Sequence, residues 1–339
     1  MAERIHIKSP GEVAKMQKAG AVTAEILMEI GAEVQVGRTT REIDDIAREI
    51  FKKHKVGNSF YQYRGFPGQL CISINEEVVH GSAGPRRIQN GDIVSLDVGA
   101  VVDGWHGDNA MTVPVGMVDP EKLRLLAVTE ESLFRAIELV RPGALLADVC
   151  AAVEGFVRPR GFTVVRDFVG HGIGRHLHEE PQIPNYRPHY KLPRLKKGMA
   201  LAIEPMVNAG RPSVKILDDG WTVVTADGKP SAHFEHTVIV TDGAPLIVTD
   251  RPRIAMRGRN SSALLLCNFS PLQGMTPPVS SVPVILEKTA ARRMVWVDVA
   301  RVVACILIIA NHMAFYSAEL YRWLWAEVLA ARTPFFLLA

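Results

Sequence analysis

Apolar and polar positions follow helical spacing in two stretches of the chain, residues 21–44 and 127–150, which also resemble each other in sequence. Laid over one another without a gap, they share residues at several positions and bring Gly37 opposite Gly143. A glycine between two such runs indicates a turn. Each stretch therefore predicts a helix, a glycine turn and a second helix.

An apolar run follows each predicted pair of helices. Residues 90–97 align with residues 197–204, so that Asp97 coincides with Glu204 at the end of an apolar predicted strand. An ordered repeat of helices followed by a strand is typical of a duplicated unit. The pattern predicts an α/β (α+β) fold of two halves related by a pseudo-twofold axis, with one carboxylate from each half meeting in the middle.

Residues 93–116 predict two β-strands joined around Asp103 and Gly104. If the connecting loop holds an even number of residues, Asp97 and Asp108 lie on the same face of this hairpin, opposite or diagonal to each other. An odd loop or a bulge would separate them. Two carboxylates side by side in mid-sheet repel each other unless a cation lies between them. In the alternative, Asp108 caps a turn and Asp97 is a surface residue.

Two further acidic residues fall in strand-like segments. Glu204 ends an apolar run directly before Pro205, and Glu235 lies inside an alternating segment whose other face would hold Phe234 and Val238. With the two aspartates, they bring the number of acids predicted in buried strands to four.

Residues 169–181 contain three glycines and three histidines in an order too irregular for a helix. The glycines let the backbone approach a ligand closely. His171 or His178 offers a neutral imidazole nitrogen to a metal ion or a substrate. One histidine alone carries little weight, because most histidines are surface or core residues.

Asp97, Asp108, Glu204 and Glu235 with His171 form an oxygen-rich set that carries four negative charges. Two divalent cations would neutralise it, and hard or borderline ions such as Mn, Fe or Co suit these donors. Paired ions lower the pKa of water and stabilise the oxyanion of amide or ester hydrolysis. The chain has no GxSxG, GxxxxGK[ST] or strand–GxGxxG–helix pattern, so serine hydrolases, P-loop proteins and dinucleotide-binding folds lose their main support.

Composition agrees with a folded enzyme. Of 339 residues, 47% are apolar and 22% are charged, and the net charge of +3 gives no support to DNA binding through bulk charge. The four cysteines are scattered without a CxxC pair, which argues against a disulfide framework and a thiolate zinc site. The first residues lack the apolar run of a signal peptide, so we expect a cytoplasmic catalytic domain.

Composition changes near residue 251. We expect a catalytic domain at residues 1–250, a Pro- and Ser-containing linker at 251–291 and an apolar tail at 292–339. Within the tail, residues 295–316 predict a borderline transmembrane helix that would attach the protein to a membrane, with a buried helix of a small soluble domain as the alternative. Basic residues before this span would leave the catalytic domain in the cytoplasm.

The chain closely resembles type I methionine aminopeptidase in five segments, residues 63–81, 95–113, 169–186, 202–207 and 219–238. The resemblance covers about residues 3–250 and is highly specific. It implies the pita-bread fold, two divalent metal ions (Co, Mn, Fe or Zn) and removal of the N-terminal methionine from newly made chains with a small second residue. We expect a monomeric catalytic domain.

The same resemblance implies roles for individual residues. The residues that match the family's five metal ligands are Asp97, Asp108, His171, Glu204 and Glu235. His80 and His178 match the histidines that contact the substrate and the tetrahedral intermediate, and with Glu204 they are the expected catalytic residues. The residues that match the lining of the methionine pocket are Tyr63, Phe66, Cys71 and Trp221. An apolar, sulfur-tolerant pocket suits a thioether.

Three departures from the family pattern concern the shape of the pocket. Leu177 stands where an aromatic residue is usual, Arg64 stands where a histidine is common, and residues 82–87 read SAGPRR in place of a shorter text. The metal ligands are not among these departures.

Other interpretations stay open. A proline-directed or creatinase-like hydrolase of the same fold shares the five ligands by resemblance, but usually carries an extra domain ahead of the catalytic one. In a non-enzymatic binding module of this fold, the ligand set would be eroded. Basic residues within 191–197 are candidates for contact with ribosomal RNA, with a solvated loop as the alternative. Residues 292–316 resemble the first span of the membrane acyltransferase-3 family, but the tail is too short for a working acyltransferase.

Overall fold

The structure is a computed structural model that describes residues 5–253. The predicted tail at 292–339, its membrane span at 295–316 and its acyltransferase-like stretch lie outside the described residues, as does almost all of the predicted linker. Within residues 5–253, no helix has the length and apolar character needed to cross a membrane.

Four α-helices of the described chain form two pairs. They are α1 (Pro10–Ala32), α2 (Thr40–His54), α3 (Pro120–Ile137) and α4 (Leu146–Val157). Gly37 lies between the first two helices with φ of 92°, and Gly143 lies between the other two with φ of 85°. This left-handed region is open to glycine at little cost. The predicted repeat of helix, glycine turn and helix is therefore confirmed.

The start of α2 shows how the sequence specifies one of these helices. The Thr39 hydroxyl accepts the N–H of Glu42 at 3.1 Å, and the Glu42 carboxylate accepts the N–H of Thr39 at 2.7 Å. This capping box satisfies two backbone donors that the first helical turn leaves unpaired. The apolar face of α2 then buries Ile43, Ala47 and Phe51.

The strands of residues 5–253 form four sheets. The first contains β1 (Gly57–Asn58), β2 (Cys71–Ile74), β4 (Ile93–Val102) and β5 (Trp105–Pro114). The second contains β6 (Thr163–Val164), β10 (Met206–Asn208) and β13 (Ser231–His233), and the third contains β3 (Glu77–Val79), β11 (Val214–Ile216) and β12 (Val223–Thr225). The fourth runs in the order β15 (Leu246–Ile247), β14 (His236–Ile239), β9 (Ala200–Ile203), β7 (Gly170–Gly172) and β8 (Glu179–Ile183). Short 3-10 helices cover Tyr63–Gly65 and Arg158–Arg160.

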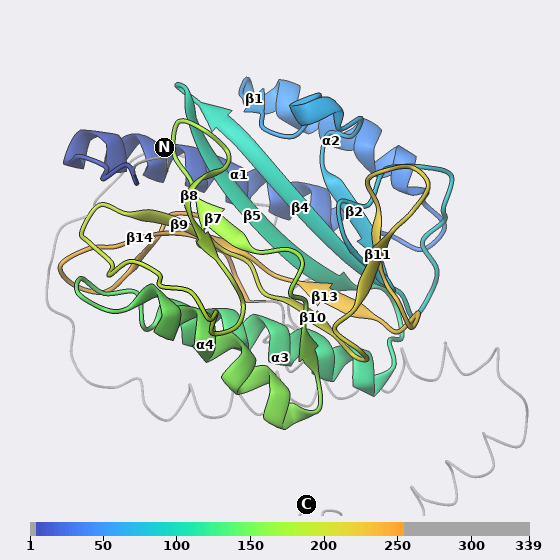
Figure 1. Cartoon of the computed structure of the whole chain (residues 1–339). Coiled ribbons are helices and arrows are strands. Elements are labelled where there is room, and N and C mark those ends of the chain that lie inside the picture. Colours follow the sequence, from blue (N-terminus) through green and yellow to red (C-terminus); the bar gives the residue numbers. More distant parts are fainter. Residues whose placement is uncertain (1–4, 254–339) are drawn as a thin grey trace, which may run out of the picture. The chain divides into compact units, whose positions relative to one another are not determined.

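The helices cover the strands from two sides, as Figure 1 shows. Helix α1 packs against β4 and β5, and helix α3 packs against β9, β10 and β13. One apolar core joins the two sides, with Ile26 from α1, Leu96 from β4, Leu133 from α3 and Leu201 from β9. The predicted α/β (α+β) class is confirmed.

The hairpin of β4 and β5 turns where the sequence predicts, and its loop holds an even number of residues. Its ladder runs without a shift, and Asp103 and Gly104 form the two-residue loop. Asp97 pairs with Ala110 and Asp108 pairs with Gly99, so the two aspartates lie diagonally across the ladder on the same face. The alternative of a turn-capping Asp108 is excluded, because this residue lies within β5 and is buried.

Two local predictions about the acidic residues are wrong. Asp97 does not end its strand, because β4 continues to Val102 into the hairpin. Glu235 does not lie inside a strand: its N–H donates to the carbonyl of Ala110 at 2.9 Å, and the ladder breaks between β13 and β14. The segment around it is buried on both faces, so alternation does not distinguish an inner from an outer face.

Residues 251–253, the last that the structure describes, contact the folded unit. Arg251 donates to the carbonyl of Ala110 at 2.8 Å and pairs with Glu130 at 3.4 Å, with both charged side chains 1% exposed. Arg253 lies over the ring of Phe134, 3.5 Å from its centroid. A catalytic unit cut after residue 250 would lose these contacts.

Candidate metal centre and substrate pocket

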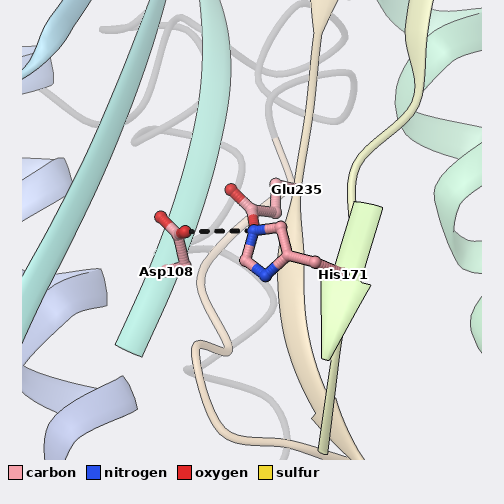
Figure 2. A group of neighbouring side chains, drawn as sticks. All are labelled: Asp108, His171 and Glu235. Atoms are coloured by element: carbon pink, nitrogen blue, oxygen red, sulfur yellow. Dashed lines mark ion pairs between the residues drawn. The ribbon is translucent and has the colours of Figure 1, made fainter. Parts of the chain in front are cut away.

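Three side chains with metal-binding atoms converge from different strands. Asp108 comes from β5, His171 from β7 and Glu235 from the break between β13 and β14, and their ligand atoms lie within 4.8 Å of one another. Figure 2 shows the two carboxylates and the imidazole pointing toward each other. Nε2 of His171 lies 3.7 Å from Oδ2 of Asp108. Two oxygens and one nitrogen in this arrangement could hold a divalent ion.

Asp97 and Glu204 extend this cluster. Glu204 follows β9 directly, and its Oε1 lies 3.5 Å from Nε2 of His171. Its other oxygen lies 3.6 Å from Nε2 of His233. Asp97 lines the same cavity from the neighbouring strand of the hairpin. The structure thus brings together all five residues that the sequence analysis singled out as a ligand set.

Several buried atoms of the cluster have no hydrogen-bond partner among residues 5–253. They include one carboxylate oxygen each of Asp97, Asp108 and Glu235, and Nε2 of His233. A buried anionic oxygen without a donor is costly, because its lost hydration is not replaced. Divalent cations would replace that hydration, and oxygen-rich sites are the kind that such ions prefer. The donor set therefore fits a metal centre.

Burial shifts the titration of this cluster toward neutral forms. It raises the pKa of Asp97 to about 7, assisted by the Glu204 charge and opposed by His233. It raises the pKa of Glu204 to about 8, and with neighbouring carboxylates it raises the pKa values of Asp108 and Glu235 well above their usual range. Metal ligands must be deprotonated, so binding of cations would release protons from this cluster.

The orientation of His171 is fixed by its own backbone neighbour. Nδ1 lies 2.9 Å from the carbonyl of Gly172, which acts as the acceptor. Nε2 is left free of its proton and turned toward the carboxylates. Burial lowers the pKa of this imidazole to about 4, so it is neutral and available as a ligand near pH 7.

Two more histidines lie at the edge of the metal cluster. The ring of His178 is 4.3 Å from that of His171, and its Nδ1 is 2.8 Å from the hydroxyl of Tyr63. His80 directly follows β3, has a positive φ of 56° and places its ring edge-on to Phe168 at 5.3 Å. Both rings line the same cavity as the carboxylates.

An apolar pocket opens beside the carboxylates in a cavity of about 210 Å³. Phe66 and Trp221 meet edge to face at 5.3 Å, and Cys71 is buried next to them. Burial and the Asp97 charge raise the pKa of the Cys71 thiol, which is therefore neutral. With Tyr63, these are the four residues expected to line a methionine pocket, and all of them line this cavity.

Comparison with known proteins shows the family. Residues 14–242 match metallopeptidase family M24. The chain belongs to this family. It is 49% identical over 235 residues to methionine aminopeptidase 1 of Bacillus subtilis, an alignment that covers 69% of this chain and 95% of that protein. The resemblance to type I methionine aminopeptidase is confirmed.

Solved structures of M24 proteins agree with this assignment. Methionine aminopeptidase from Thermotoga maritima is 46% identical with a TM-score of 0.71, covering 73% of this chain and all of that one. A prolidase from Pyrococcus furiosus is 23% identical with a TM-score of 0.59, covering 73% of this chain and 66% of that one, and it shows the fold alone. The pita-bread fold is therefore confirmed for this M24 protein.

The sequence analysis missed one residue that contacts the metal cluster and one that lines the cavity. His233 lies two positions before Glu235 and reaches Glu204, a spacing that period-two alternation offers as a signal. Phe60 lines the pocket and is 8% exposed, but the sequence around it shows no regular pattern. Of the departures from the family pattern, Leu177 lines the cavity as a buried residue and Arg64 lines it as an exposed one.

The basic segment of residues 191–197 makes contacts within the catalytic unit. Arg194 donates to the carbonyl of Gly143 at 2.8 Å, and Lys197 pairs with Asp242. These contacts fit a charged surface loop, and a ribosomal RNA contact stays a prediction.

Proposed function

We propose that this M24 protein is a metal-dependent methionine aminopeptidase, which removes the N-terminal methionine from peptides and newly made proteins. One observation carries the proposal: carboxylate and histidine side chains and an apolar, partly aromatic pocket share a single cavity. An exopeptidase needs this juxtaposition, because the first side chain must be held while the adjacent carbonyl reacts. Similarity to methionine aminopeptidases over nearly their whole length supports it.

The five clustered residues would hold two divalent ions, Co, Mn, Fe or Zn. They are Asp97, Asp108, His171, Glu204 and Glu235. The unpaired buried oxygens of Asp97, Asp108 and Glu235 and the close spacing of the set support the assignment. When bound, such ions lower the pKa of water and polarise a peptide carbonyl. With the ions bound, Glu204 would be ionised beside His171, and its carboxylate would then accept a proton during the reaction.

His178 and His80 would contact the substrate and stabilise the charge that develops on its carbonyl oxygen. If the Tyr63 hydroxyl donates to Nδ1 of His178, the ring keeps its proton on Nε2 as a donor. Desolvation, with smaller contributions from the neighbouring His171 and Arg64, lowers the pKa of His178 to about 3, so its ring stays neutral. Burial lowers the pKa of His80 to about 4. Neutral donors fixed in advance stabilise an oxyanion effectively.

The pocket formed by Tyr63, Phe66, Cys71 and Trp221 would accept one unbranched apolar side chain. The second residue of the substrate must be small, because the first carbonyl has to approach the carboxylate cluster closely. We therefore expect Met-Ala and Met-Gly peptides to be cleaved and Met-Leu and Met-Lys peptides to resist. Newly made chains are the natural substrates, and the cytoplasm is the expected place of action.

The test measures two quantities on the full chain: bound metal by elemental analysis, and methionine released from Met-Ala-Ser after loading with Mn, Fe, Co or Zn. We expect metal-dependent release of methionine. Faster turnover of Xaa-Pro peptides with another first residue would favour the proline-directed alternative. Metal binding without turnover of either peptide would indicate a binding module.

A further inference from the structure

Lys8, in the segment before α1, carries a buried charge. The residue is 5% exposed, and its Nζ lies 2.7 Å from Oε2 of Glu179. Nζ also donates to the carbonyl of His6 at 3.3 Å, while the backbone N–H of Lys8 donates to the carbonyl of Gly198 at 2.8 Å. Both the side chain and the backbone of Lys8 are therefore held in place.

The partner, Glu179, organises the turn that precedes β8. Its second oxygen, Oε1, accepts the backbone N–H of His176 at 3.2 Å. In the strand ladder Glu179 is paired with Gly172, the residue after His171. Glu179 therefore joins Lys8, the turn and the strand that carries His171.

Packing around this ion pair leaves little room for another arrangement. A Cβ at Gly174 would lie 2.7 Å from both Oε1 of Glu179 and Cε of Lys8. The carbonyl of Gly174 accepts the N–H of His106 at 2.8 Å, which fixes this glycine against β5. Close packing of this kind transmits a displacement of one group to its neighbours.

His178 directly precedes Glu179, so the backbone position of Glu179 sets where the His178 ring stands. That ring lies between the Tyr63 hydroxyl and the ring of His171. Removal of one partner from a buried ion pair leaves the other charge without compensation, and the surrounding segment then rearranges. A displacement of about 1 Å in a catalytic group is enough to lower turnover strongly.

We propose that Lys8 is a positioning residue, whose ion pair with Glu179 holds the turn that presents His178 to the substrate. The inference rests on the proposed function, because it assigns His178 the role of contacting the reacting carbonyl. Lys8 itself does not line the cavity, so its effect on turnover would pass through Glu179 and the turn.

The test compares Lys8→Met with wild type in the full, metal-loaded chain. We expect kcat for Met-Ala-Ser to fall about tenfold or more, KM to change by less than about twofold and bound metal to stay the same. Lys8→Arg keeps the charge and should recover part of the lost kcat. Lys18→Met is the matched control, because Lys18 pairs with Asp103 on the surface with both side chains 62% exposed. It should leave kcat unchanged.

A second control separates positioning from general destabilisation. Leu133→Ala removes a fully buried side chain of α3 and should lower the melting temperature without lowering kcat of the folded protein. If Lys8→Met does not fold, Glu179→Gln tests the same pair, because the amide oxygen still accepts from His176 while the negative charge is gone.

A double-mutant cycle decides whether Lys8 acts through His178. Lys8→Met added to His178→Ala should lower kcat by less than about twofold beyond His178→Ala alone. Full additivity, or wild-type kcat in both Lys8→Met and Glu179→Gln, would overturn the positioning role. Failure of the wild-type chain to release methionine would instead contradict the proposed function itself.

Discussion

The two halves of the molecule repeat their helices but place the acidic residues of the proposed metal centre on different kinds of backbone. In the first half, Asp97 and Asp108 stand on two ten-residue strands with an unbroken ladder. In the second half, Glu204 and Glu235 lie just outside strands of three or four residues. In the hairpin, the regular alternation of side chains along the strands is enough to place both aspartates on one face. In the second half, the two glutamates stand where strands end, so strand alternation does not set their direction.

The breaks in the second half are held by the first half. Glu235 donates its N–H to Ala110 on β5, and Thr237 exchanges hydrogen bonds with Asp108 through its hydroxyl at 2.8 and 3.1 Å. The positions of the aspartates in the first half therefore depend on local strand geometry. The position of Glu235 in the second half depends on contacts with the first half. Substitutions on the two sides test this difference.

The largest expected effect is loss of the metal centre. Asp97→Ala and Asp108→Ala in the first half, and Glu235→Ala in the second, should each lower kcat/KM about a thousandfold or more. Each should also lower the amount of bound metal, because it removes one negative charge from the carboxylate cluster. Asp103→Ala, at the exposed hairpin tip, is the control and should change neither quantity. Full turnover with an unchanged amount of bound metal in any of these three variants would overturn the ligand assignment.

His178→Ala should separate catalysis from metal binding. We expect the variant to keep its metal and to lose about a hundredfold to a thousandfold in kcat, as is usual when one oxyanion donor is removed. Elemental analysis and steady-state kinetics on the same sample measure both quantities. Equal loss of metal would place His178 among the ligands instead.

Metal removal should make stability depend on pH. Burial raises the pKa of Asp97 to about 7 and that of Glu204 to about 8, above their values in an unfolded chain. A carboxyl shifted this way contributes stability that is fully present below its unfolded pKa and is lost as the pH rises through its folded pKa.

The free energy of unfolding of the chelated protein should therefore fall by more than about 3 kcal/mol between pH 4 and pH 8. The metal-loaded protein should show no such fall in its urea-unfolding curves, because its ligands are already ionised. Glu204→Gln, which cannot ionise, should weaken the pH dependence of the chelated protein. A chelated protein whose stability rises toward pH 8 would contradict this account.

A shorter C-terminus should weaken the connection between the halves. Arg251 bonds to Ala110 in the first half and pairs with Glu130 in the second, so a chain ending at Asp250 removes one partner of a buried ion pair. We expect that chain to unfold at lower urea concentration than one ending at Arg253, by about 2 kcal/mol, because the hydrogen bond from the charged Arg251 side chain to the Ala110 carbonyl is lost. The chain ending at Arg253 should keep the whole aminopeptidase activity. Equal stability of both chains would show that Arg251 contributes nothing.

The smallest expected effect tests the repeated turns. Gly37 and Gly143 both have positive φ, and a Cβ at either position would have nothing within 4 Å, so only backbone strain opposes a larger residue. Gly37→Ala and Gly143→Ala should each cost about 1 kcal/mol in the free energy of unfolding. Gly155→Ala, inside α4 with open space, should be neutral or stabilising. Clearly unequal costs at the two turns would mean that the two turns are not equivalent in energy.

The amino-acid sequence alone determined the local elements and much of the candidate site. Helical spacing and matched glycines predicted both helical pairs, and even loop parity placed Asp97 and Asp108 on one face of the hairpin. These features depend on short-range geometry, which residue order specifies directly. The roles of the site residues came from motifs and resemblance, and they stay proposals.

Only the tertiary structure decided where the remaining donors stand. Glu235 lies at a strand break because its N–H bonds to Ala110, and His233 reaches Glu204, although the segments are distant in the chain. The same holds for Lys8 and Glu179, and for Arg251 and Glu130. Such pairs form because buried charges and backbone donors must find partners wherever the folded chain brings them, and periodicity carries no information about partners far away in sequence.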